Sequence, residues 1–144
     1  AERGLAQSHP ACLARRGVGH LFGMVRGIQQ DTKAAMPLLL ASAKQGYYVA
    51  IRPLFSLRFR KALTQKFDFS DLSELKRGLC WGRVAQQHTS MAGFDGFLRQ
   101  LYKFAKANDR ADLVELGQSY DPRLIPVTQI IVTPEDCIQL ELGE

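Results

Sequence analysis

Apolar residues recur at steps of three and four along most of this chain, a spacing that places them on one face of a helix. The clearest stripe follows a Ser90 cap and consists of Phe94, Phe97, Leu98, Leu101, Phe104 and Ala105. The polar residues Arg99, Gln100, Lys103 and Lys106 face away from that stripe. Further helices are predicted over Leu13–Gln30, Ala34–Lys44 (with a stop at Gly46), Ser70–Gln87 and Asn108–Gly117. The pattern predicts a mainly α protein, a single-domain helical bundle of about five helices.

Residues 47–66 fit two patterns. Strand is favoured by Tyr47, Tyr48, Val49 and Ile51, and by the alternation of Phe55, Leu57 and Phe59 with polar residues. Helix is favoured by Lys61, Ala62, Leu63 and Gln65, and Pro53 suits the first position of a helix. We favour helix for this segment.

The pattern of residue types changes after Leu124. Val127, Thr128, Ile130, Ile131, Val132 and Thr133 are mostly β-branched and predict a strand. Thr133–Asp136 fits either a hairpin turn or a helix start, and Ile138, Leu140 and Leu142 then alternate with polar residues. This alternation favours a small β-hairpin near the C-terminus, so residues 124–142 are open between strand and helix.

A length of 144 residues suits one domain with a single core. Residues 1–10 lack apolar periodicity and predict a flexible N-terminal lead-in, which leaves 11–144 as a single globular domain. The three cysteines Cys12, Cys80 and Cys137 are far apart and odd in number, which indicates neither a disulfide framework nor a thiolate metal site. The expectation is an intracellular, reducing compartment, the cytoplasm or an organelle.

Charge is unevenly distributed along the chain. Residues 1–108 hold 17 of the 19 Lys and Arg but 6 of the 14 Asp and Glu, a balance of +11, while residues 109–144 stand at −6. The predicted domain therefore has a basic helical body, 11–108, and an acidic C-terminal part, 109–144. A basic body attracts polyanions, and it also attracts acidic protein segments.

Eight cations fall within 32 residues and are interleaved with aromatic rings. They are Arg52, Arg58, Arg60, Lys61, Lys66, Lys76, Arg77 and Arg83. Lys and Arg neutralise phosphates, and exposed rings offer faces for unpaired bases. These eight residues are the predicted nucleic-acid-binding site, although aromatic residues in such a segment are more often core.

No catalytic chemistry is indicated by the sequence. The P-loop, dinucleotide, acyl-transfer and zinc-hydrolase signatures do not occur, and the histidines His9, His20 and His88 are scattered. Neither an enzyme, nor a metal site, nor a cofactor is expected, and nothing in the sequence predicts a membrane span.

The leading hypothesis is a non-catalytic, basic helical subunit that binds the backbone of single-stranded RNA or DNA with little sequence specificity, inside a larger nucleoprotein assembly. The rival is a structural protein–protein interaction subunit of a large complex, with an organelle left open as its location. Two roles remain open for the acidic part: head-to-tail contact with another copy of the chain, or cover for the basic face of its own chain.

Overall fold

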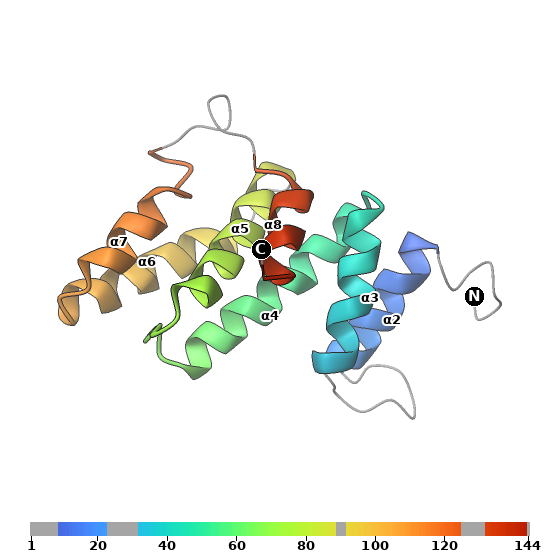
Figure 1. Cartoon of the computed structure of the whole chain (residues 1–144), viewed down its shortest axis with the longest axis horizontal. Coiled ribbons are helices and arrows are strands. Elements are labelled where there is room, and N and C mark those ends of the chain that lie inside the picture. Colours follow the sequence, from blue (N-terminus) through green and yellow to red (C-terminus); the bar gives the residue numbers. More distant parts are fainter. Residues whose placement is uncertain (1–8, 23–31, 89–91, 125–131, 144) are drawn as a thin grey trace. The chain divides into compact units, whose positions relative to one another are not determined.

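The computed structural model describes residues 9–22, 32–88, 92–124 and 132–143, and these residues are mainly helical (Figure 1). The elements are α2 (Pro10–Phe22), α3 (Thr32–Lys44), the 3-10 helix η1 (Tyr48–Ala50), α4 (Ile51–Thr64), α5 (Leu72–His88), α6 (Ala92–Ala107), α7 (Ala111–Gln118) and α8 (Pro134–Glu141). The described residues form no strand. The mainly α prediction is confirmed, with seven α-helices in this part of the chain where about five were expected.

The chain divides into two compact units, Ala1–Leu57 and Arg58–Glu144. Helix α4 contributes residues to both of them. The single domain expected from the length of the chain stays a prediction.

In the first unit, α2 and α3 lie side by side (Figure 1). Gly17 permits this close packing, because a Cβ atom there would lie 2.7 Å from Cγ of Leu39. The hydroxyl of Ser42 donates a hydrogen bond to the carbonyl of Pro10 (2.6 Å) and ties α3 to the start of α2. Pro10 thus belongs to a helix, whereas residues 1–8 of the predicted lead-in lie outside the described part.

Residues 48–64 are helical, so the helix that we favoured for residues 47–66 is confirmed over most of that segment. The 3-10 turn of η1 precedes α4, which begins at Ile51, two residues before Pro53. On α4, Leu54 and Phe55 are buried. A strand would have put these two neighbours on opposite faces, whereas here a helix buries both.

The second unit is built around α5 and α6. From α6 the unit buries Phe94, Phe97, Leu98, Leu101 and Ala105, which confirms the predicted stripe, while Phe104 is partly exposed. The start of α5 is capped by Asp71, whose carboxylate accepts a hydrogen bond from the backbone N–H of Ser73 (2.9 Å). That hydrogen bond lowers the pKa of Asp71. The cap therefore lies one residue after Ser70, the residue that the sequence pattern predicts as the cap.

Gly117 allows α7 to approach α6 closely. It is buried inside α7, and a Cβ atom there would lie 2.9 Å from Cε1 of Tyr102 and 3.0 Å from Cδ2 of Leu101. Gly96 on α6 is the contrasting case, because a Cβ atom there would meet nothing within 4 Å.

These two glycines give a matched pair of substitutions. We expect Gly117→Ala to lower the free energy of unfolding by about 1–3 kcal/mol, because the added methyl group overpacks the contact with Tyr102. Gly96→Ala should raise it by about 0.5–1 kcal/mol, because alanine has the higher helix propensity. Chemical denaturation of both variants measures the difference. Equal shifts of the same sign would contradict the close contact at Gly117.

The predicted C-terminal hairpin is wrong in its second strand. Ile138 and Leu140 lie in α8, and Leu142 is its C-cap. Thr133 and Asp136 form a capping box, in which each side chain accepts a hydrogen bond from the backbone of the other residue, and Pro134 stands at the first helical position. These start signals outweigh the alternation of only three apolar residues. Residues 125–131 of the predicted first strand lie outside the described part.

Candidate nucleic-acid interface

The eight predicted cations fall into three environments. Arg52, in the first unit, and Arg60, Lys66 and Lys76, in the second unit, are exposed. Arg58, Lys61 and Arg77 make ion pairs within the second unit. Arg83 is 1% exposed. Binding of nucleic acid by these eight residues stays a prediction. Their side chains do not share one environment.

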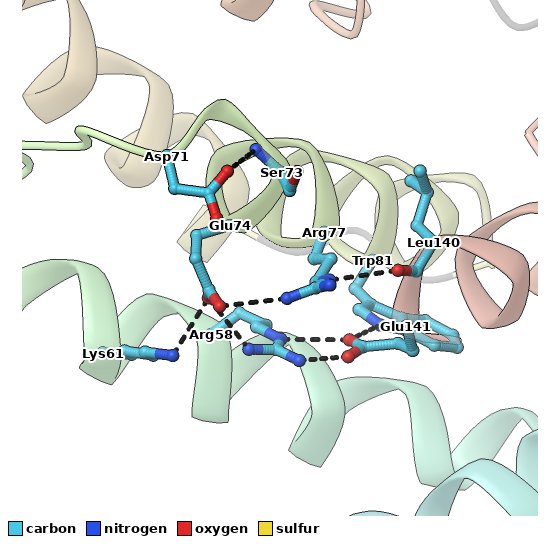
Figure 2. Close-up of polar contacts among 9 residues, drawn as sticks. All are labelled: Arg58, Lys61, Asp71, Ser73, Glu74, Arg77, Trp81, Leu140 and Glu141. Carbon is cyan, nitrogen blue, oxygen red and sulfur yellow. Dashed lines mark hydrogen bonds and ion pairs between the residues drawn. The ribbon is translucent and has the colours of Figure 1, made fainter. Parts of the chain in front are cut away.

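The ion pairs form a cluster that links α4, α5 and α8 (Figure 2). We call it the Glu141 cluster, and it comprises Arg58, Lys61, Glu74, Arg77, Trp81 and Glu141. Its centre is a pair in which both Nε (3.0 Å) and Nη2 of Arg58 donate to the carboxylate of Glu141. The indole N–H of Trp81 donates to the same carboxylate (2.8 Å). The side chains of Arg58 and Glu141 are only 10% and 3% exposed.

Glu74 completes the cluster from the first turn of α5. Its carboxylate pairs with Arg58 (3.2 Å), Lys61 (3.1 Å) and Arg77 (3.0 Å). Arg77 also donates from Nε to the carbonyl of Leu140 (3.0 Å). The guanidinium groups of Arg58 and Arg77 are therefore bonded to acceptors of their own chain, and only Lys61, whose side chain is 44% exposed, also faces solvent substantially.

Arg83 and Asp121 are both buried in the second unit. Burial lowers the pKa of the Arg83 guanidinium, and the charge of Asp121 acts in the opposite direction. The carboxylate of Asp121 accepts hydrogen bonds from the hydroxyl of Tyr102 (2.9 Å) and from Nε of Arg123 (3.1 Å). Burial alone would raise the pKa of Asp121, but these hydrogen bonds outweigh it and hold that pKa below its ordinary value. Arg83 and Asp121 thus belong to the interior of the fold, whereas the Arg123 side chain is exposed.

A disulfide joins Cys80 of α5 to Cys137 of α8, with the two Cα atoms 5.5 Å apart. The sequence-based view that no disulfide is indicated was therefore wrong for this pair, while Cys12 is free. Only the fold brings together cysteines that are 57 residues apart. The bond is in tension with the expected reducing compartment, where thiols are usually kept reduced.

The division into units changes how the charge is distributed. Residues 1–57 contain seven Lys and Arg against two Asp and Glu, a net charge of +5. Residues 58–144 contain twelve of each, so the second unit has a net charge of zero. The acidic C-terminal part therefore balances the basic residues of its own unit, and the whole positive excess of the protein belongs to the first unit.

Several exposed cations were not among the predicted site residues. In the first unit these are Arg15, Lys33 and Lys44. On α6, Arg99, Lys103 and Lys106 are exposed along one face, as the helical spacing predicts. Arg15 and Lys44 lie outside the densest run of cations, so local density along the sequence could not select them. Counting charge separately for each unit does select them, but such a count requires the boundary at Leu57.

The described residues contain no group of three His, Cys, Asp or Glu side chains that could hold a metal ion. Among the helices of that same part of the chain, none is long and apolar enough to cross a membrane. No protein-family model, no curated protein and no solved structure matches this chain.

Proposed function

We propose that this protein is a non-catalytic subunit that binds the backbone of single-stranded nucleic acid with little sequence preference, and that its first unit supplies the binding charge. The observation that carries the proposal is the location of the entire net charge of +5 in residues 1–57. A concentrated positive charge attracts phosphates and releases their counterions on binding.

The second unit supports this assignment by contrast. Arg58 and Arg77 are held by carboxylates and a carbonyl of their own chain. Binding a phosphate would require these bonds to break and would leave Glu141, buried beside Trp81, with less of its compensating charge. Exposed cations such as Lys44 and Arg52 can meet a phosphate without that cost.

The experiment is a titration of a fluorescent single-stranded oligonucleotide with the full chain, followed by anisotropy at several salt concentrations. The salt slope should correspond to roughly four to seven contacts, at about 0.7 per phosphate for single strands. We expect the double reversal Lys44→Glu with Arg52→Glu to weaken binding about tenfold, because two exposed charge contacts of up to ~1 kcal/mol each are lost. The salt slope should fall by about 1.4.

The matched control is Lys103→Glu with Lys106→Glu, which changes the net charge equally on exposed residues of the second unit. This control should leave affinity nearly unchanged. Equal loss in the two double variants would mean that total charge, rather than the first unit, governs binding. Absence of binding even at ~50 mM salt, where phosphate contacts are strongest, would overturn the proposal.

The same titration separates nucleic acid from the rival partner, an acidic protein. Poly-glutamate should compete weakly, and displacement of the oligonucleotide by an equal charge of poly-glutamate would favour the protein–protein subunit. The acidic part of the chain uses Glu141 to bind its own Arg58. We therefore do not extend the proposal to head-to-tail contact between copies.

A further inference from the structure

The first unit contains an open groove that lies outside the Glu141 cluster. Its volume is about 490 Å³, within the range of ligand-binding sites. The lining residues are Ala11, Ala14, Arg15, Val18 and Gly19 of α2, together with Tyr47 and Val49.

The groove is open because the residues of α2 that line it are mostly small. Ala11, Ala14 and Gly19 leave the space that longer side chains would fill. Val49, which also lines the groove, stands in the 3-10 turn and is 61% exposed, although its side chain is wholly apolar. Tyr47 is partly exposed. The walls are therefore apolar, with one aromatic ring and one exposed guanidinium, that of Arg15.

Tyr47 precedes the cation-rich segment Arg52–Arg83 and differs from the aromatic residues within it. Phe55, Phe67, Phe69 and Trp81 are buried. Phe59 is partly exposed, but its ring packs edge-to-face on Phe67 and Phe97. The expectation that most rings among these cations are core holds for these residues, whereas Tyr47 lines an open groove.

We propose that this groove is the base-stacking subsite of the nucleic-acid interface: one unpaired base stacks on Tyr47 against the apolar wall, and Arg15 binds the adjoining phosphate. The inference rests on the proposed function and goes beyond it, because backbone binding alone requires no base. Its support is the combination of an aromatic ring, an apolar wall and a cation in the unit that carries the positive excess.

A protein partner fits this groove less well. A stable protein interface involves about 20–30 residues on each side, whereas seven of the residues that the structure describes line the groove. An apolar partner segment would also gain nothing from the net charge of +5 around it. A flat, apolar base attached to an anionic phosphate matches both the small size of the groove and the positive charge of the first unit.

The test compares two strands with the same number of phosphates, oligo-dT and an abasic strand of equal length. We expect the full chain to bind oligo-dT roughly 5- to 150-fold more tightly than the abasic strand, the range for one stacked base. Tyr47→Ala should abolish this preference and leave affinity for the abasic strand unchanged. Tyr47→Phe should retain the preference, because the ring face remains. Arg15→Gln should weaken binding of the two strands equally.

Three outcomes separate this inference from the proposed function. If neither strand binds at low salt, both ideas fail. If the two strands bind equally, or if Tyr47→Ala keeps the preference, the base subsite is wrong and backbone binding stands. Should Tyr47→Ala unfold by circular dichroism, Tyr47→Leu keeps an apolar side chain without the ring, and retention of the dT preference in that variant would overturn the inference.

Discussion

Reduction of the Cys80–Cys137 disulfide is expected to lower the free energy of unfolding by about 4 kcal/mol. The bond closes a loop across a sequence separation of 57 residues, and the chain-entropy relation gives about this value for a loop of that length. It also holds α8, a helix of eight residues, which is too short to be stable in water alone. Urea denaturation with and without a thiol reductant measures the change.

Two variants control this experiment. Cys12→Ser removes the free cysteine and should leave the effect of the reductant intact. Cys137→Ala should start at the lower stability and should not respond to the reductant. If the wild-type protein unfolds at the same urea concentration in both conditions, the bond contributes nothing to stability and α8 is held by its other contacts.

Glu141→Ala is expected to lower the free energy of unfolding by about 3–5 kcal/mol, the cost of breaking a buried ion pair by removing one partner. The Glu141 side chain is 3% exposed, and its carboxylate accepts hydrogen bonds from Arg58 and from the indole of Trp81. Its loss leaves the Arg58 guanidinium with Glu74 as its remaining carboxylate and leaves the indole N–H without its acceptor. Thermal or urea denaturation of the oxidised protein measures the difference.

Glu135→Ala is the matched control, because Glu135 lies on the same helix but is exposed and bonds to Gln139. It should change stability by no more than about 1 kcal/mol. Replacing both partners, Arg58→Met with Glu141→Leu, should recover much of the loss, since a buried pair exchanged for apolar groups is often nearly neutral. A Glu141→Ala variant as stable as Glu135→Ala would show that the Glu141 cluster does not hold α8 in place.

Local signals in the sequence identified most of the helices. The stripe on α6 and the helix formers at the end of α4 predicted these elements because each helix buries one face at a spacing of 3.6 residues. The error at Ile138–Leu142 arose where two local signals competed, and the capping box of Thr133 and Asp136 prevailed over a short alternation. In such a short segment the start signals constrain the backbone more than three apolar positions do.

The candidate site was less predictable because it depends on residues far apart in the chain. The sequence around Arg58 shows a cation among aromatic residues, and its partner Glu141 follows 83 positions later. The pairing of Cys80 with Cys137 and the burial of Arg83 are likewise set by how the helices pack. The position of Tyr47 beside an open groove could not be distinguished in sequence from the buried position of Phe55.

The Cys80–Cys137 bond also imposes an order of events on biosynthesis. Cys137 is made 57 residues after Cys80, a delay of about 3–11 s at ordinary rates of translation. Cys12, the remaining cysteine of this sequence, precedes both and has already been made by then. During this interval Cys80 has no native partner, so any bond that it formed with Cys12 would be non-native, and the native bond can form only once α8 has been made.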